Sequence, residues 1–251
     1  MRVLVTGVAN GIGAATAAVL RGEGAEIVGV DVADGDWHKL DLSDVSAIDA
    51  FKVDGKFDAL INAAGLPPRD GNEARVLTVN YHGLTRFTER MIPAMKRGGS
   101  IVSMASKAGS KWRENLEQVQ RFQATEPDGV DAFVAAESVD GVRSYDLSKE
   151  ALIVWTKSQT PRLIALGLRA NTVSPAAVDT RILDDFMTAF GERASRGVAL
   201  TGRPGTAEEV AAVLAFLAKP ESGWVKGANV VVDGGLDAQL ECMQLGIPTA
   251  S

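Results

Sequence analysis

The sequence predicts an α/β fold in which one doubly wound parallel sheet carries helices on both faces. Three observations support this prediction. Short apolar runs alternate with longer segments of helical period along the whole chain. The apolar runs lack the polar alternation of half-exposed strands, so we expect helices to cover both faces of the sheet. The first apolar run passes directly into a glycine-rich turn between Thr6 and Gly13.

We expect six strands and five helices in alternation. The strands are expected at residues 3–5, 26–30, 59–62, 100–103, 169–174 and 229–232. The helices are expected at residues 12–21, 73–96, 144–166, 184–190 and 207–217. The last helix follows Thr206, and Glu209 stands three residues later, which is the pattern of a capping box.

Segment 111–141 interrupts this alternation. Apolar side chains from Trp112 to Phe122 fall on one helical face, which predicts a helical insertion rather than a loop. Two roles stay open at this stage. The insertion either lines a substrate pocket, through Trp112 or Phe133, or alters how subunits assemble.

The chain has 251 residues and is expected to form a single domain, 1–251, with one substantial core. Hydrophobic residues make up 46% and charged residues 23%, as in ordinary globular proteins. A net charge of −6 without a basic stripe argues against nucleic acid as a partner. With one cysteine, Cys242, and two histidines, His38 and His82, we expect no metal site.

The hydropathy pattern also bears on location. The apolar run at residues 3–5 is too short for a signal peptide, and it reads as a strand. Other apolar stretches fall short of the ~20 residues that span a bilayer. We therefore expect a cytoplasmic protein with no membrane partner.

The turn after the first strand has glycines at positions 7, 11 and 13. Glycines let the backbone turn tightly and approach a diphosphate, and the following helix N-terminus offers unpaired N–H groups to the anion. The pattern favours a dinucleotide cofactor bound to a Rossmann-type fold. The alternative is that these glycines mark only a tight turn between strand and helix.

Asp31 ends the second strand, 18 residues after Gly13. A carboxylate there accepts hydrogen bonds from the hydroxyls of the adenosine ribose and repels a 2′-phosphate. Residues 8–10 and 32–33 include no arginine or lysine to compensate such a phosphate, so NAD is favoured over NADP. The alternative is that Asp31 caps a turn.

An ordered set of motifs resembles the short-chain dehydrogenase/reductase family. The motifs are Thr6-Gly-x3-Gly-x-Gly, Asp41-Leu42, Asn62-Ala63-Ala64-Gly65, Asn80, Ser106, Tyr145-x3-Lys149, Pro175 to Thr180 and Asp233-Gly234-Gly235. Each motif is weak alone, but the ordered set covers nearly the whole chain and is specific. The short spacing from Asp31 to Asp41 and the long one from Ser106 to Tyr145 resemble the branch that contains bacterial 3α-hydroxysteroid dehydrogenase/carbonyl reductase and coniferyl-alcohol dehydrogenase.

This resemblance implies a set of cofactor contacts. They are Gly7, Asn10, Gly11, Ile12, Gly13, Asp31, Asp41, Leu42, Asn62, Ala63, Gly65, Tyr145, Lys149, Pro175, Val178 and Thr180. Asp41 and Leu42 are expected to lie against the adenine, and Thr180 against the nicotinamide amide. Two positions depart from the family pattern: Ala176 stands where glycine is usual, and Lys107 directly follows Ser106.

Tyr145 and Lys149 are four residues apart on a predicted helix, so they share one face. An ammonium group nearby, together with the positive ring of an oxidised nicotinamide, favours the phenolate. Tyr145 is therefore the candidate general base for alcohol oxidation and the general acid for the reverse reaction. Ser106 is expected to hydrogen-bond the substrate oxygen. The alternatives are an exposed Tyr–Lys pair and an ordinary turn serine.

The resemblance adds two further roles. Lys149 is expected to hold the nicotinamide ribose, and Asn80 to anchor a water between Lys149 and solvent. Of the remaining candidates, His82 is expected to be a partly buried polar residue, and Cys242 a small packed side chain rather than a nucleophile.

The resemblance implies that the segment at 181–200 is the substrate lid. Ile182, Phe186 and Phe190 stand there at helical spacing, and an apolar lid suits a steroid or an aromatic substrate. The alternative is an ordinary packed helix or a subunit contact.

We therefore expect an NAD-dependent oxidoreductase that interconverts a hydrophobic alcohol, either a 3α-hydroxysteroid or an aromatic alcohol such as coniferyl alcohol, and its carbonyl compound. An alternative of a different class is a catalytically idle NAD-binding regulatory module. By analogy with the family we also expect a homo-oligomer, with a dimer favoured.

Overall fold

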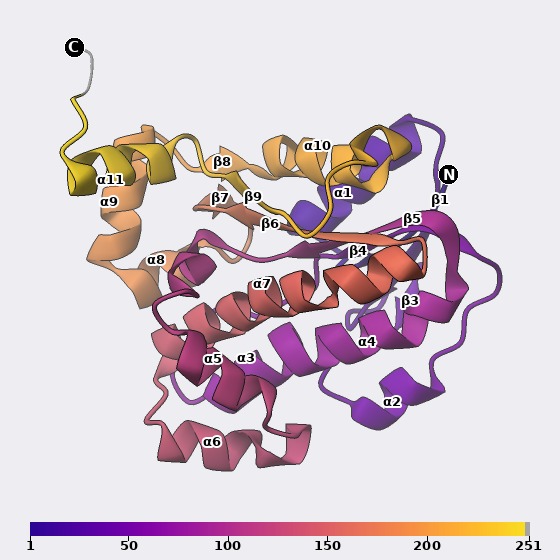
Figure 1. Ribbon diagram of the computed structural model, residues 1–251, viewed down its shortest axis with the longest axis horizontal. Helices are drawn as coiled ribbons and strands as arrows, with labels where there is room; N and C mark the ends of the chain where they lie inside the picture. The colour runs from indigo at the N-terminus through magenta and orange to yellow at the C-terminus, as the bar shows by residue number, and fades with distance from the viewer. Residues whose placement is uncertain (249–251) are drawn as a thin grey trace.

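The computed structural model describes residues 1–248, and within them seven strands form one parallel sheet (Figure 1). The strands are β1 (Arg2–Thr6), β2 (Glu26–Asp31), β3 (His38–Lys39), β4 (Phe57–Asn62), β5 (Met95–Met104), β6 (Arg169–Pro175) and β9 (Asn229–Val232). Their order is β3-β2-β1-β4-β5-β6-β9, so the direction of winding reverses between β1 and β4. The predicted doubly wound sheet is confirmed, and all six expected strands are present.

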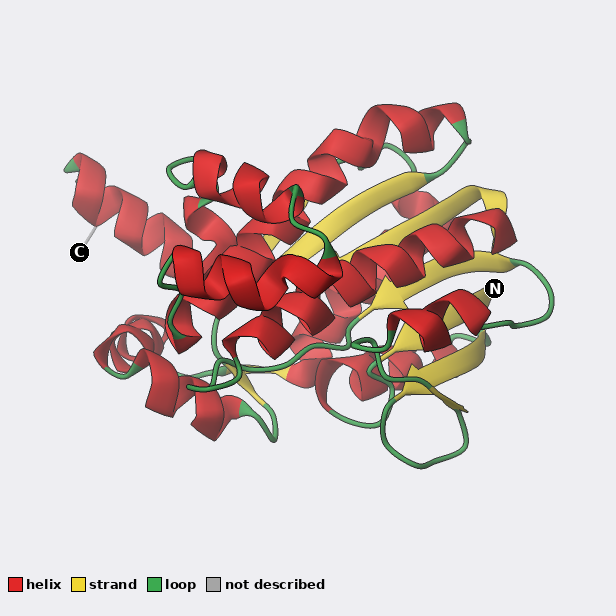
Figure 2. Cartoon of the chain, turned by 90° about the horizontal axis from the view of Figure 1, so that it is seen from below, coloured by secondary structure: helices red, strands yellow, loops and turns green. Residues whose placement is uncertain are grey.

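Helices cover both faces of this sheet. They are α1 (Gly11–Gly22), α2 (Val45–Ala50), α3 (Glu73–Leu77), α4 (Leu84–Met91), α5 (Leu116–Gln123), α6 (Val130–Ala136), α7 (Gly141–Ala165), α8 (Leu183–Phe190), α9 (Glu192–Thr201), α10 (Ala207–Ala218) and α11 (Leu236–Leu245). In Figure 1, α1 and α10 lie above the sheet, and α4 and α7 lie below it. Figure 2 is seen from below, and the lower helices cross in front of the strands.

The alternation of side chains along each strand divides the core into two. Val3 and Val5 of β1 belong to the cluster that α1 and α10 close with Leu20 and Leu214. Leu4 points to the other face, where it joins the cluster under α4 and α7. Because both faces are buried, each strand reads as a continuous apolar run.

The expected capping box is confirmed at the start of α10. The Thr206 hydroxyl accepts a hydrogen bond from the Glu209 N–H, and the Glu209 carboxylate accepts one from the Thr206 N–H. None of the helices between residues 1 and 248 combines the length and the apolar character that a bilayer span requires.

The expected helix at 73–96 is wrong in two respects. It is interrupted by a π-helical stretch, Thr78–Gly83, and it ends with a 3-10 turn at Ile92–Ala94. Lys96 belongs to β5 instead, because Met95 is buried and pairs with Phe57 in the sheet. Helices α2, α9 and α11 and the short strand β3 were not expected from the sequence.

The insertion is helical, as predicted, and consists mainly of α5 and α6. Its buried rings pack behind α7: the Phe122 ring lies 5.1 Å from that of Tyr81 and 5.5 Å from that of Phe133. Helix α7 begins at Gly141, three residues earlier than expected, because the Asp140 carboxylate accepts a hydrogen bond from the Arg143 N–H.

Gly83 gives a test of how closely these elements approach. A methyl group on residue 83 would stand 1.8 Å from the carbonyl oxygen of Leu42, which is backbone and has little room to move. We expect Gly83→Ala to lower the free energy of unfolding by roughly 2–3 kcal/mol, measured by urea denaturation.

The matched control is Gly22→Ala in the last turn of α1. A methyl group there meets no atom within 4 Å, so alanine should leave stability unchanged or raise it by less than about 1 kcal/mol. Equal stabilities of the two variants would show that Gly83 is not required for the close contact.

Candidate active site

A cavity of about 1340 Å³ opens at the carboxyl ends of the central strands, where the order of the sheet reverses. In open α/β sheets this is where ligands bind. The glycine-rich turn lines one end of the cavity, and α8, α9 and α11 line the other. The volume exceeds the roughly 300–1,000 Å³ of ordinary small-molecule pockets, so a dinucleotide and a second molecule both fit.

The glycine-rich turn forms a backbone cradle. Gly7 and Gly11 have φ angles of +70° and +57°, which only glycine adopts freely. A methyl group on Gly13 would stand 2.1 Å from the Gly7 carbonyl oxygen. The Asn10 side chain does not cap α1, so the N–H groups of the first turn remain available to an anion. This cradle fits the diphosphate of a dinucleotide.

Asp31 stands beside the cradle at the end of β2. One carboxylate oxygen accepts a hydrogen bond from the Ala9 N–H and the other from the Ala33 N–H, each at 3.0 Å. Asp31 therefore braces the turn, and it is also one of the residues that line the cavity. Each oxygen keeps a lone pair with which it can accept a further hydrogen bond.

The structure brings most of the predicted cofactor residues into the cavity wall. They are Gly7, Asn10, Gly11, Ile12, Gly13, Asp31, Asp41, Leu42, Ala63, Gly65, Tyr145, Lys149, Pro175, Val178 and Thr180. Asn62 is the exception. Its side chain is buried and donates hydrogen bonds to the hydroxyls of Thr88 and Ser103, at 2.9 and 3.1 Å. Asn62 therefore joins β4 to its neighbours instead of lining the cavity.

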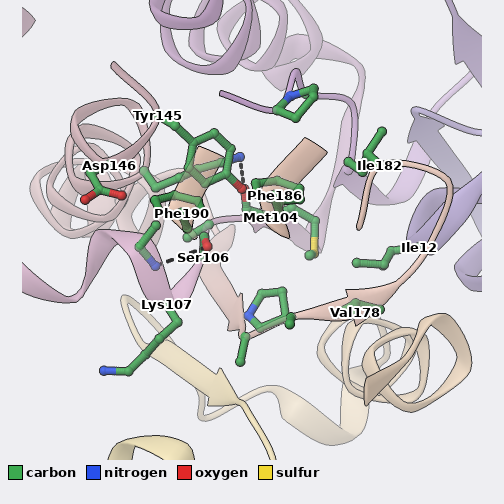
Figure 3. Close-up of a pocket in the computed structure, with 18 of the residues that line it drawn as sticks. Ile12, Met104, Ser106, Lys107, Tyr145, Asp146, Val178, Ile182, Phe186 and Phe190 are labelled. Atoms are coloured by element: carbon green, nitrogen blue, oxygen red, sulfur yellow. Dashed lines mark hydrogen bonds between the residues drawn. The ribbon is translucent and has the colours of Figure 1, made fainter. Parts of the chain in front are cut away.

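Tyr145 and Lys149 are both buried on one face of α7, exposing 7% and 4% of their surfaces. The ammonium of Lys149 lies 5.4 Å from the centre of the Tyr145 ring and donates a 2.9 Å hydrogen bond to the Met104 carbonyl. Ser106 follows β5 and its hydroxyl accepts a hydrogen bond from the Ala108 N–H (Figure 3). The exposed Tyr–Lys pair considered above is excluded by this burial.

Burial dominates the proton affinities of this pair. It raises the pKa of Tyr145 above its ordinary value; a hydrogen bond with the Ser106 side chain lowers it, and the negative charge of Asp146 raises it. Burial lowers the pKa of Lys149 to about 8. The expected lowering of the Tyr145 pKa by Lys149 is not found, because burial, the largest cause, raises this pKa.

Asn80 lies behind the cavity wall, on the π-helical stretch. Its side chain accepts a 2.7 Å hydrogen bond from the Leu66 N–H and donates one of 3.0 Å to the Leu66 carbonyl. A methyl group on Gly65 would stand 3.1 Å from Asn80 Oδ1 and 3.6 Å from Lys149 Nζ, so the two side chains are neighbours. Single π-helical turns often occur at functional sites. The bridging water stays a prediction.

The lid segment covers Tyr145 with aromatic rings. The ring centre of Phe186 lies 5.0 Å from that of Tyr145, and the ring centre of Phe190 lies 6.1 Å from it. The two phenylalanine rings are parallel to within 3° (Figure 3). Ile182 also lines the cavity. This wall is apolar, as the sequence predicts.

The insertion contributes differently from expectation. Its first residues, among them Lys111 and Arg113, line the cavity, whereas Trp112 and Phe133 do not. Trp112 packs against the cations of Arg113 and Lys157, and Phe133 belongs to the cluster behind α7. The expectation that Trp112 or Phe133 lines the pocket is therefore wrong.

Helix α11 forms a wall of the site that the sequence did not indicate. Leu236 and Leu240, four residues apart on this helix, line the cavity. An ion pair between Lys107 and Asp237 ties α11 to the segment after Ser106. The unusual lysine after Ser106 therefore joins the segment that carries Ser106 to the wall of the pocket.

Two other residues considered in the sequence, His82 and Cys242, do not line the cavity. His82 is partly buried, as expected, and burial lowers its pKa to about 4. Cys242 is only half-buried on α11, so it is less packed than predicted.

A parallel doubly wound sheet with a dinucleotide cradle beside a buried Tyr–Lys pair defines an oxidoreductase that uses a nicotinamide cofactor. A family model described as "Enoyl-(Acyl carrier protein) reductase" matches residues 7–121 and 129–237. The chain belongs to the short-chain dehydrogenase/reductase family.

Two relatives carry the names of the expected branch. A coniferyl-alcohol dehydrogenase of Pseudomonas sp. is 37% identical over 246 residues, which cover 94% of this chain and 96% of that one. A 3-alpha-hydroxysteroid dehydrogenase/carbonyl reductase of Comamonas testosteroni is 32% identical over 258 residues, covering 96% and 98%.

A solved structure confirms the fold. The 3-alpha-hydroxysteroid dehydrogenase from Pseudomonas sp., in complex with NADH, superposes with a TM-score of 0.85 at 25% identity. The match covers 99% of this chain and 100% of that one.

The buried charge of Lys149 predicts an effect on stability. We expect Lys149→Met to raise the free energy of unfolding at pH 7 by roughly 2 kcal/mol. A fall in pKa from 10.5 to about 8 corresponds to a cost of roughly 3 kcal/mol, and the lost hydrogen bond to Met104 offsets about 1 kcal/mol.

The pH dependence follows from the same group. The folded chain binds the Lys149 proton less tightly than the unfolded chain does. The free energy of unfolding of the wild type therefore rises between about pH 8 and 10.5 as this group loses its proton. Urea denaturation at pH 7 and near pH 9.5 should show the advantage of Lys149→Met shrinking towards zero. The control Lys157→Met, half-buried on the same helix, should give no gain at pH 7. A gain that is independent of pH would contradict this account.

Proposed function

We propose that this chain is an NAD-dependent oxidoreductase that interconverts a hydrophobic alcohol, either a 3α-hydroxysteroid or an aromatic alcohol such as coniferyl alcohol, and its carbonyl compound. One observation carries the proposal. Ser106, Tyr145 and Lys149 converge in one cavity, between a cradle that fits a dinucleotide and an apolar lid.

The side chains divide the chemistry between them. Bound NAD supplies the hydride acceptor. Tyr145 Oη takes the hydroxyl proton of the alcohol in oxidation and returns it in reduction, while Ser106 Oγ hydrogen-bonds the substrate oxygen. The Lys149 charge, 5.4 Å from the Tyr145 ring, favours the phenolate. The rings of Phe186 and Phe190 exclude water from the phenol.

The choice of NAD rests on Asp31. Asp31 lines the cavity at the end of β2, and two backbone N–H groups fix its carboxylate. A rigid carboxylate suits the two hydroxyls of the adenosine ribose and disfavours a phosphate in the same place.

The substrate class rests on the lid and on the relatives. Ile182, Phe186, Met187 and Phe190 form an apolar wall, which gains binding energy from a steroid or an aromatic body. The two relatives at 37% and 32% identity are named for coniferyl alcohol and for 3-alpha-hydroxysteroids. Both classes therefore belong in the first substrate panel.

Tyr145→Phe tests the assignment of the proton-transfer group. We expect turnover to fall by about a hundredfold to ten-thousandfold, because the phenol hydroxyl is removed and general acid–base catalysis with it. NADH formation should be followed with coniferyl alcohol, 3α-hydroxysteroids and short aliphatic alcohols. NAD affinity, measured by calorimetry, should change by less than about twofold, because the ring remains.

Undiminished turnover in Tyr145→Phe would exclude this residue as the acid–base group. If the wild-type chain binds NAD and oxidises nothing on the panel, the result would favour the catalytically idle NAD-binding module instead.

Asp31→Ser tests the cofactor preference. The wild-type chain should use NAD better than NADP. The variant should bind NAD about tenfold more weakly, because the ribose loses a charged hydrogen-bond acceptor. It should bind NADP more tightly, because the carboxylate that repels the 2′-phosphate is gone. Asp34→Ser is the control, because Asp34 is exposed and paired with Lys39 outside the cavity. Equal use of both cofactors by the wild-type chain would contradict the choice of NAD.

A further inference from the structure

An ion pair joins the lid to the catalytic helix, one residue beyond Tyr145. Asp146 Oδ2 on α7 accepts a 2.7 Å hydrogen bond from Arg193 Nη1 on α9. The Asp146 side chain is 16% exposed and that of Arg193 is 50% exposed. The second oxygen, Asp146 Oδ1, is buried and has no hydrogen-bond partner among residues 1–248. A carboxylate so enclosed depends strongly on its one partner.

Arg193 also contacts the aromatic part of the lid. Its guanidinium carbon lies 4.6 Å from the centre of the Phe190 ring, and that ring lies 6.1 Å from the ring of Tyr145 (Figure 3). The contacts therefore link four residues in a ring. Asp146 pairs with Arg193, the Arg193 guanidinium lies over Phe190, and the Phe190 ring lies beside that of Tyr145, which precedes Asp146 in the chain. Moving Arg193 away breaks the ion pair and the cation–π contact together.

Arg193 is the ion-pair partner of Asp146, because the other arginine nearby is paired elsewhere. Arg143 also lies near Asp146 on α7, but its guanidinium is paired with Glu150 at 2.6 Å. The Glu150 carboxylate is 1% exposed, so that pair is held inside the molecule.

A second ion pair, Arg69 with Asp185, joins α8 to the loop after β4 at 2.8 Å. Both of its side chains are more exposed than Asp146, at 59% and 27%. Exposed pairs contribute little to stability, so the pair at Asp146 is the stronger of the two links.

We propose that Arg193 and Asp146 form a latch that holds α8 and α9 closed over the substrate site, which makes Arg193 a positioning residue for substrates with rings. The latch acts through Phe190, which it keeps against Tyr145. A ring-bearing substrate lies against this aromatic wall, whereas a short aliphatic alcohol reaches Ser106 and Tyr145 without it. This inference rests on the proposed function for its substrate classes.

The test compares Arg193→Met, Asp146→Asn and the double variant with the wild-type chain. Arg162→Met is the matched control. Arg162 lies near the C-terminal end of α7, outside the cavity, and forms an exposed ion pair with Glu89 of α4. The first readout is amide hydrogen exchange across residues 183–201. We expect exchange in each latch variant to be roughly fivefold to tenfold faster, between the effects of an exposed and a buried pair.

The double variant should exchange no faster than either single variant, because all three lose the same interaction. The second readout is kinetic. KM for a ring-bearing substrate should rise by a similar factor in the latch variants, while KM for a short aliphatic alcohol and the affinity for NAD stay as in the wild type. The control should match the wild type in both readouts.

Amide exchange at the wild-type rate in Arg193→Met would overturn the latch. So would a double variant whose exchange is faster by the product of the two single-variant factors. An equal rise in KM for ring-bearing and short alcohols would overturn its role in positioning. Hydrogen exchange needs no turnover, so it tests the latch even if the panel is not oxidised. A lack of turnover by the wild-type chain would count against the proposed function alone.

Discussion

A buried ammonium group is the constraint on which the rest of the site depends. Lys149 exposes 4% of its surface, and its hydrogen bond to the Met104 carbonyl only partly replaces the water it has lost. The cation is held at the end of β5, where it donates to the carbonyl of Met104, the last residue of that strand, from its buried position on α7. Retaining such a charge against its cost in stability is typical of a group that serves chemistry rather than folding.

The same dehydration acts in opposite directions on the two partners. It lowers the pKa of Lys149 and raises that of Tyr145, because it disfavours an ammonium and a phenolate alike. The phenol therefore holds its proton firmly while the lid rings of Phe186 and Phe190 enclose it. A positive charge that enters the cavity lowers both pKa values, because it favours the phenolate of Tyr145 and further disfavours the ammonium of Lys149. The lid and the proton affinity of Tyr145 are thus linked by one physical cause.

Features set by local pattern were predictable, whereas features set by contacts between distant residues were not. The glycine cradle and the shared face of Tyr145 and Lys149 follow from spacing alone. The π-helical turn does not, because Asn80 is held by the distant backbone of Leu66. The inward direction of Asn62 depends on hydrogen-bond partners from α4 and β5. The Asp146–Arg193 ion pair joins residues 47 positions apart, so local spacing gives no sign of it.

The distribution of burial explains why a single ion pair matters to the lid. Helix α7 buries about half of its length in the core, including Tyr145 and Lys149, whereas α8 and α9 bury no residue fully among those described. Segments with few buried contacts open at low cost, so the lid belongs to the mobile end of the stability range. The glycine cradle stands on the rigid sheet, and Tyr145 and Lys149 stand on α7. Under the proposed function, the rigid position of Tyr145 beside a loosely held wall lets the Arg193 contact decide which substrates are enclosed without disturbing proton transfer.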